Sequence, residues 1–249
     1  MSLPIVLVSG WAMPATIMEP LAEALDGDGR ASIVQLPGLV WERGKKYDWK
    51  QLMNYLDMHL LETPVILVGW SLGGTLASIY ASQNPDKVAG LVTLGCNPCF
   101  VRNSDWSEAM LPQTFESFYA GMQEDSVATV DQFSLLCSMG NTNRKEVLKT
   151  LQSAISRDAD LESTILLQLL QLLGASDVRS QLSDIRCPVI HCFGKDDALV
   201  PSDTGSRIEK DYPGHKVLMM DGGHCFFLDQ SSGAIRQVAD QVNRLCNRS

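Results

Sequence analysis

Ser71 lies in the segment 69–73, G-W-S-L-G, which matches the pattern G-x-S-x-G and is followed by Gly74. In this pattern a strand turns sharply into a helix, and small residues two positions before and after the serine leave room for the strained turn. The hydroxyl group is then exposed above the carboxyl ends of the strands. The N-terminus of the following helix favours negative charge at that point. The pattern therefore predicts a nucleophilic serine, and the alternative is a serine in an ordinary glycine turn.

A serine hydroxyl needs a base to become a nucleophile, and four histidines are available. His224 follows the segment M-M-D-G-G, where a glycine-rich loop after the last predicted strand brings an imidazole over the edge of the sheet. His59 and His191 fall inside a predicted helix and a predicted strand, and His215 fits a surface loop. We therefore assign His224 as the base.

The base in turn needs a carboxylate that orients it, and the expected chain order is serine, acid, histidine. The segment 187–201, C-P-V-I-H-C-F-G-K-D-D-A-L-V-P, supplies Asp196 and Asp197 directly after a predicted strand. Asp197 has the better spacing from Gly194 and Pro201, and Asp196 stays open as the alternative. The resulting triad is Ser71, Asp197 and His224.

Acyl transfer also needs two backbone N–H groups that stabilise the oxyanion. One is expected from Leu72, the residue after the nucleophile, and the other from the loop that follows the first strand. In that loop Gly10 gives the backbone room, and Trp11 is the expected donor. The alternative for Trp11 is a core aromatic residue, and the two roles are compatible. In comparable enzymes the loss of one such donor costs roughly 3–4 kcal/mol.

These residues have to be positioned by strands and helices that alternate along the chain. Six short runs are mostly apolar along their whole length, which is typical of strands covered on both faces: 5–8, 32–35, 65–68, 88–94, 189–192 and 216–220. Helical spacing occurs between them at 16–26, 49–61, 72–83, 203–211 and 230–246. This alternation predicts an α/β fold with a mainly parallel, doubly wound sheet.

The alternation is interrupted between residues 97 and 183 by a block with helical spacing at 114–122, 126–138, 143–155 and 160–173. We interpret this block as a helical lid inserted into a core made of residues 1–96 and 184–249. The alternative is a set of additional helices without a gating role.

Composition narrows the function further. The 249 residues carry a net charge of −9, which makes nucleic acid a poor partner. No run approaches the about 18 apolar residues of a membrane helix, and the N-terminus lacks the basic region of a secretion signal. We expect a cytoplasmic monomer without a membrane partner. The seven cysteines are interpreted as buried thiols, because the C-x-x-C pattern at 96–99 is weak when it stands alone.

The segments G-W-S-L-G-G, L-V-T-L-G-C-N-P-C-F, F-G-K-D-D-A-L-V-P and G-G-H resemble the pimeloyl-[acyl-carrier protein] methyl ester esterases of biotin synthesis, and the likeness covers nearly the whole chain. The resemblance implies an α/β-hydrolase fold, a serine esterase without metal or cofactor, and hydrolysis of a methyl ester on acyl carrier protein. It assigns the catalytic and oxyanion roles to the same residues as above. It also implies a substrate-binding set consisting of Trp11, Trp70, Leu72 and Phe133.

Two departures from the family concern the surroundings of the site. The loop before Trp11 has Ser9 where the family more often has histidine, and His224 is followed by C-F-F instead of a small residue, proline and phenylalanine. The first departure affects local hydrogen bonding, and the second affects the outer wall of the pocket.

An acidic carrier protein needs a basic patch on an acidic enzyme. The segment 141–157 has a net charge of +3, because a single Glu146 faces four cations: Arg144, Lys145, Lys149 and Arg157. Lys145 and Lys149 are four residues apart and share a helix face. Together with the family resemblance, this pattern predicts a carrier-protein contact, and the alternative is a solvated helix face.

Three other functions remain open at this point. A general carboxylesterase of short-chain esters shares the G-W-S-L-G-G segment, and an enol-lactone hydrolase uses related chemistry. A ligand receptor of the same fold would retain the triad with little turnover. A serine at position 71 disfavours the dehalogenase and epoxide hydrolase reactions, in which this position carries aspartate.

Overall fold

A computed structural model describes residues 3–25, 30–38, 44–158 and 162–247. Six parallel strands form one sheet in the order β2-β1-β3-β4-β5-β6. Their bounds are β1 (Ile5–Val8), β2 (Ala31–Val34), β3 (Val65–Trp70), β4 (Val88–Leu94), β5 (Val189–Gly194) and β6 (Lys216–Met220). The predicted parallel α/β sheet is confirmed, and each predicted strand is present with ends shifted by at most two residues.

The burial of the strands follows their place in the sheet. Every residue of β1, β3 and β5 is buried, because helices cover both faces of the central strands. The edge strands β2 and β6 are only partly buried, and each carries a polar or charged residue near its start, Ser32 in β2 and Lys216 in β6. The continuous apolar runs of the central strands are thus the sequence signature of a sheet with two covered faces.

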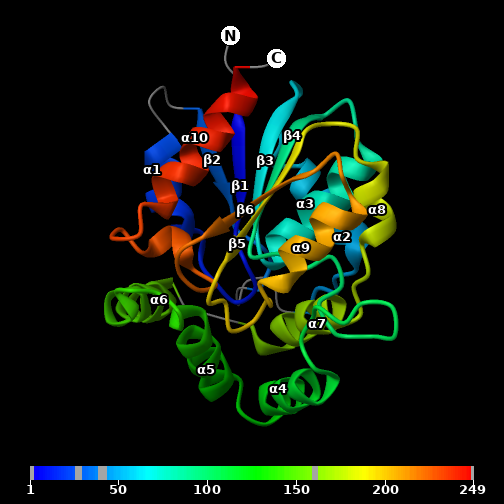
Figure 1. The fold of residues 1–249 in the computed structure, drawn as a ribbon. Coiled ribbons are helices and arrows are strands. Elements are labelled where there is room, and N and C mark those ends of the chain that lie inside the picture. The colour runs from blue at the N-terminus through cyan, green and yellow to red at the C-terminus, as the bar shows by residue number, and fades with distance from the viewer. Residues whose placement is uncertain (1–2, 26–29, 39–43, 159–161, 248–249) are drawn as a thin grey trace.

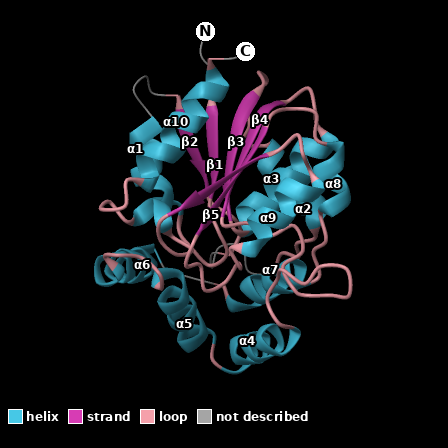
Figure 2. Ribbon diagram, viewed as in Figure 1, coloured by secondary structure: helices cyan, strands magenta, loops and turns pink. Residues whose placement is uncertain are grey.

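Helices cover the two faces of this sheet (Figures 1 and 2). One face carries α1 (Glu19–Leu25) and α10 (Ala234–Cys246), which pack against each other. The other carries α2 (Trp49–Asp57), α3 (Leu72–Gln83), α8 (Arg179–Asp184) and α9 (Asp203–Asp211). Short 3-10 helices precede α1 (η1, Ala15–Met18) and α10 (η3, Phe226–Leu228).

The chain between β4 and β5 forms the remaining helices, α4 (Pro112–Glu124), α5 (Ser126–Ser138), α6 (Arg144–Asp158) and α7 (Ser163–Gly174). They lie past the carboxyl ends of the strands (Figure 1). The short helix α8, which sequence periodicity does not reveal, packs against α3 in the layer beside the sheet. The division into core and lid therefore stays a proposal, in which α4–α7 form the lid and α8 is part of the core layer.

Candidate active site

Ser71 occupies the turn between β3 and α3. Its backbone has φ 53° and ψ −119°, and apart from Ala12 it is the only non-glycine residue of the described chain with positive φ. Such a conformation costs of order 1–3 kcal/mol and persists only where the surroundings enforce it. Here the Ser71 N–H donates to the carbonyl of Leu94 at the end of β4 (2.9 Å), and the Ser71 carbonyl accepts from the first turn of α3. In this conformation Ser71 lies at the edge of the sheet and is 6% exposed.

The glycines of the G-x-S-x-G pattern are required by close backbone approach. A Cβ atom on Gly69 would overlap the carbonyl oxygen of Gly73. A Cβ atom on Gly73 would overlap the carbonyl oxygen of Ser9 at the end of β1. Any side chain at either position would push α3 away from the sheet, and Ser71 would move with it.

His224 and Asp197 form a buried pair next to this turn. The Nδ1 atom of His224 lies 2.8 Å from Oδ2 of Asp197, and both side chains are 0% exposed. The second oxygen of Asp197 accepts hydrogen bonds from the N–H groups of Leu199 (2.8 Å) and Val200 (2.9 Å). Asp196, the alternative acid, is exposed, and Asp197 is the aspartate that contacts the ring of His224.

The other ring nitrogen of His224, Nε2, is buried and has no hydrogen-bond partner among the described residues. An unsatisfied buried polar atom costs about 1–3 kcal/mol, so its presence calls for an explanation. Because Nδ1–H donates to Asp197, Nε2 is the acceptor nitrogen of the neutral ring. The Trp70 Nε1–H donates to the His224 carbonyl (3.2 Å), and the two rings are 5.6 Å apart, which places His224 beside the residue that precedes Ser71.

The remaining histidines lie elsewhere. His191 Nδ1 lies 2.7 Å from the Thr93 hydroxyl, and its Nε2 lies 3.1 Å from Nδ1 of His215. Burial, with a smaller contribution from His215, lowers the pKa of His191 to about 3. His59 follows α2 and is exposed, and its ring contacts the carbonyl of Tyr55 in that helix. None of the three hydrogen-bonds to the Ser71 turn or to Asp197.

The backbone N–H groups of Trp11 and Leu72 have no hydrogen-bond acceptor among the described residues. Leu72 is the first residue of α3, where the first N–H groups of a helix lack partners within the helix. Trp11 precedes Ala12, the second non-glycine residue with positive φ (54°). Ser9, the departure from the family pattern, is fully buried, and its hydroxyl accepts from the Leu36 N–H (3.2 Å), which ties the Trp11 loop to the chain after β2.

Ser71 opens into a cavity of about 570 Å³ between the strand ends and helices α4, α5 and α7. Apolar side chains form most of its wall, and the exposed Gln113, Thr114, Ser117 and Gln132 add polar groups. The apolar lining consists of Trp11, Phe100, Met110, Phe115, Phe118, Phe133, Leu136, Leu170, Leu173 and Leu199.

Of the predicted substrate-binding residues, Trp11 and Phe133 lie in the cavity wall, with their rings 5.0 Å apart and edge to face. The Trp11 Nε1–H donates to the Leu166 carbonyl in α7 (2.8 Å), which anchors the indole. Trp70 does not line the cavity: it is fully buried and packs against Phe227 and His224. Side chains alternate along a strand, so the residue before the nucleophile points away from the side on which Ser71 opens. Leu72 is also absent from the lining and is placed to contribute only its N–H.

The sequence reasoning missed most of the wall, because it comes from three helices whose faces are fixed only by packing. The spacing of Phe115 and Phe118 in α4 is the one signal that marks an aromatic helix face.

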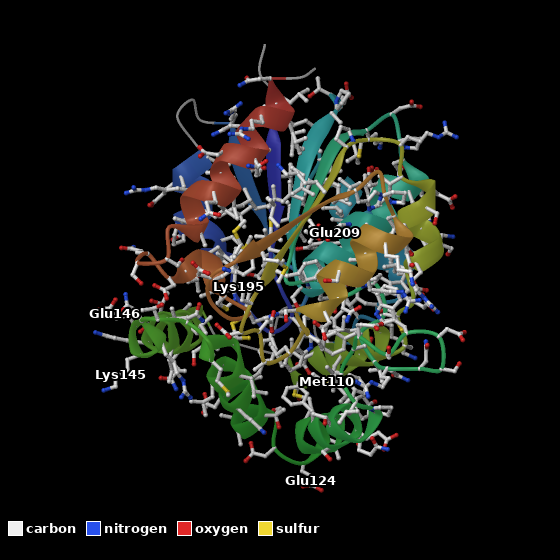
Figure 3. All side chains as sticks on the ribbon, viewed as in Figure 1. Met110, Glu124, Lys145, Glu146, Lys195 and Glu209 are labelled. Carbon is white, nitrogen blue, oxygen red and sulfur yellow. The ribbon has the colours of Figure 1, made fainter. Side chains whose placement is uncertain are left out.

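The predicted cations fall on α6, and Arg144, Lys145 and Lys149 are exposed. Figure 3 shows Lys145 at the outer edge of α6, pointing away from the rest of the molecule. Lys149 faces a groove against η1 and α1 that also contains Glu19, Glu23 and Glu146. The side chain of Arg157 lies outside the described residues.

Within the described part of the chain, no group of three His, Cys, Asp or Glu side chains is arranged to hold a metal ion. No described helix is both long and apolar enough to cross a membrane. All seven cysteines are free thiols. In the C-x-x-C segment, Cys96 lies against the Thr75 hydroxyl and Cys99 contacts the Val101 carbonyl.

Comparison with known proteins gives three findings. The sequence profile described as "alpha/beta hydrolase fold" matches residues 37–231. The pimeloyl-[acyl-carrier protein] methyl ester esterase of Nitrosomonas europaea is 30% identical over 225 residues, which cover 90% of this chain and 89% of that protein. The biotin biosynthesis bifunctional protein BioHC of Teredinibacter turnerae is 31% identical over 96% of this chain, which spans only 44% of that longer protein.

Among solved structures, an esterase from Exiguobacterium antarcticum superimposes with a TM-score of 0.82. The superposition covers 98% of this chain and 93% of that one, at 18% sequence identity. At that identity the likeness concerns the fold alone.

Proposed function

Because this chain belongs to the alpha/beta hydrolase fold family, we propose that Ser71, His224 and Asp197 hydrolyse a carboxylic ester as nucleophile, base and orienting acid. The proposal rests on how the two nitrogens of the His224 imidazole are held. Its Nδ1 is bound to a buried carboxylate, its Nε2 is buried without a partner among the described residues, and its ring lies 5.6 Å from that of Trp70, the residue before Ser71. An imidazole held in this way is prepared to accept the proton of a serine hydroxyl.

The reaction proceeds by acyl transfer. His224 Nε2 takes the hydroxyl proton as Ser71 Oγ attacks the ester carbonyl, and the Trp11 and Leu72 N–H groups stabilise the oxyanion. The imidazolium then gives its proton to the leaving alkoxide, which departs as the alcohol. A water molecule, deprotonated by His224, attacks the acyl-enzyme, and the free acid leaves as Ser71 recovers its proton. Asp197 orients the imidazole throughout and is itself held by two backbone N–H groups.

The proposed substrate is the methyl ester of pimeloyl-[acyl-carrier protein], and the proposed product is the free acid used in biotin synthesis. The Nitrosomonas europaea relative is named for this ester, and it matches this chain over most of both lengths. A cavity of about 570 Å³ with a mainly apolar wall suits an acyl chain better than the methyl group of the alcohol. The acyl chain therefore lies in the cavity, with its methyl ester end at Ser71.

The proposed contact for the carrier protein is the exposed row of cations on α6. Arg144, Lys145 and Lys149 provide local positive charge on a chain whose net charge is −9. The acidic side chains beside Lys149 weaken its share of that charge, so Arg144 and Lys145 contribute most.

Two measurements test the proposal. Ser71→Ala should abolish turnover of a p-nitrophenyl ester by the purified protein, because no other group replaces the nucleophile. The wild-type gene should rescue a biotin-requiring strain that lacks its own pimeloyl-carrier methyl ester esterase, and the Ser71→Ala gene should not. Unchanged turnover in Ser71→Ala would refute the mechanism. Turnover without rescue would favour a general carboxylesterase, and the absence of steady turnover would favour a ligand receptor.

A further inference from the structure

The turn between α5 and α6, residues 139–143, packs against the loop after β6 that carries His224, called the base loop below. The carbonyl oxygen of Met139 occupies the place that a Cβ atom on Gly223 would need. At the far end of the turn, the Asn143 N–H donates to Oδ2 of Asp229, a buried carboxylate in the segment that follows His224 (3.1 Å). The helices that cover the cavity are thus fastened to the base loop at two points.

The same turn also contacts the loop after β5 that contains Asp196 and Asp197, called the acid loop below. A Cβ atom on Gly140, whose φ is +78°, would overlap the carbonyl oxygen of Asp196, the residue before Asp197. The Asp196 N–H in turn donates to the Gly222 carbonyl (3.0 Å), which joins the acid loop to the base loop. The turn 139–143 therefore lies where both loops meet.

One side chain of this turn reaches the base loop, and it belongs to Asn141, which is 7% exposed. Its Oδ1 atom accepts a hydrogen bond from the N–H of Gly223, the residue before His224 (3.3 Å). Its Nδ2 atom donates to the carbonyls of Cys137 (3.4 Å) and Ser138 (3.1 Å), in the last turn of α5. Those carbonyls have no partner within the helix. The Asn141 amide therefore provides hydrogen bonds to the end of α5 and to the Gly223 N–H at the same time.

A second contact supports the same junction. Burial, together with a contact to the Cys225 thiol, raises the pKa of the Cys137 thiol. Cys137 belongs to α5 and Cys225 directly follows His224, and both are fully buried. Helix α5 therefore packs on the residue after the histidine, and the turn 139–143 packs on the residue before it. The Asn141 amide supplies the directional bond.

We propose that Asn141 is a positioning residue for His224: it fixes the Gly223 peptide, and thereby holds the imidazole between Asp197 and Ser71. The role follows from the geometry of the loop. Among the described residues the imidazole has one side-chain hydrogen-bond partner, Asp197, and the backbone of His224 is held through its neighbours. A displacement of about 1 Å at a reacting group can cost about 10²-fold in rate. This inference rests on the proposed function of His224 as the base.

The test separates the two ends of the Asn141 amide. Asn141→Ala removes both, and kcat for p-nitrophenyl acetate should fall at least about tenfold with KM within about twofold, since the cavity wall is unchanged. Asn141→Asp keeps an oxygen for the Gly223 N–H and loses the donor to α5, so it should recover most of kcat. The assay is run at about pH 8.5, above the ordinary range of imidazole titration, so that the added carboxylate does not keep the base protonated. Asn143→Ala is the matched control on the same turn, because Asn143 acts through its backbone, and it should retain wild-type kcat.

Several results would overturn the inference. Wild-type kcat in Asn141→Ala would do so, as would a loss carried by KM alone. If Asn141→Asp were as impaired as Asn141→Ala, the side chain would serve only to cap α5. Should Asn141→Ala fail to fold, Asn141→Ser, whose short hydroxyl cannot span both partners, is measured in its place.

A readout that does not depend on turnover keeps this inference distinct from the proposed function. In a histidine NMR titration, Asn141→Ala should shift the His224 ring signals and leave those of His59 unchanged. If Ser71→Ala had no effect on turnover, the proposed function would fail, and the His224 signals would still decide whether Asn141 positions the ring. Unchanged His224 signals in a folded variant would refute the inference.

Discussion

Asp197 is bound on both oxygens, one by His224 and the other by two backbone N–H groups, and neither oxygen is exposed. This arrangement fixes the carboxylate before the imidazole ever becomes charged. Adjacent Asp196 has the same chemistry and no comparable contacts. The difference between two neighbouring aspartates is thus entirely a matter of which one the loop after β5 turns inward.

Asp197→Asn should lower kcat by about 10⁴-fold, because the amide no longer selects the tautomer that leaves Nε2 free to accept a proton. Turnover of a p-nitrophenyl ester measures the effect. The matched control is Asp196→Asn, which should keep kcat within about twofold. A larger loss in the control than in Asp197→Asn would reverse the assignment of the acid.

At the scale of elements, the cavity depends on how closely α4 lies on α7. A Cβ atom on Gly174, at the end of α7, would overlap the Phe115 ring, which is part of the cavity wall. Because residue 174 has no side chain, the aromatic face of α4 can pack closely against the end of α7. The Phe115 ring then stays out of the cavity at Ser71.

Gly174→Ala should displace the Phe115 ring and narrow the cavity. We expect KM for p-nitrophenyl octanoate to rise at least about fivefold, with KM for the acetate changed by less than about twofold. Gly214→Ala, at a loop glycine with open space around it, is the control and should change neither value. Equal effects on the two esters would place the acyl chain outside this part of the cavity.

Helix α6 carries the second prediction at this scale. Lys145→Glu/Lys149→Glu should lower kcat/KM for the carrier-bound ester at least about tenfold and spare p-nitrophenyl acetate, because no described residue of α6 lines the cavity at Ser71 and only the carrier protein would contact these lysines. The loss should shrink as salt rises. The control Lys50→Glu/Lys210→Glu makes the same change of charge on α2 and α9 and should spare both substrates. Equal losses with both substrates would contradict the docking role.

At the scale of the whole molecule, the sheet brings together residues that are far apart in sequence. All strands are parallel, so the turns after β1, β3 and β5, together with the loop after β6, reach the same edge. The sheet also holds a titratable pair away from the site, of which His191 is buried and His215 is half-buried. His191 in β5 and His215 before β6 contact each other, Thr93 and the rings of Phe193 and Tyr212 surround them, and burial lowers both pKa values.

This histidine pair should make the fold sensitive to acid. The unfolded chain takes up protons near the ordinary pKa of histidine, whereas His191 in the folded chain remains neutral down to about pH 3. The free energy of unfolding should therefore fall as pH falls below about 6.5, with His191 contributing up to about 1.4 kcal/mol per pH unit. Urea unfolding between about pH 7 and pH 4 measures this slope.

His191→Gln should have a smaller slope than wild type over that pH range, even though it loses hydrogen bonds at neutral pH. His59→Gln is the control and should keep the wild-type slope, because His59 is exposed. An unchanged slope in His191→Gln would mean that other groups cause the acid sensitivity.

The sequence by itself determined the parallel sheet and the ends of α3, α5 and α9, and it indicated the candidate nucleophile, the candidate base and two adjacent aspartates for the acid, because these depend on local patterns. Strand burial, glycine spacing and chain order are all visible in short segments. Only the tertiary structure decided between Asp196 and Asp197, removed Trp70 from the cavity wall and brought Asn141 to the base loop. These outcomes depend on which side of a strand, loop or turn faces a segment distant in the sequence, and that choice is made by packing across the whole fold.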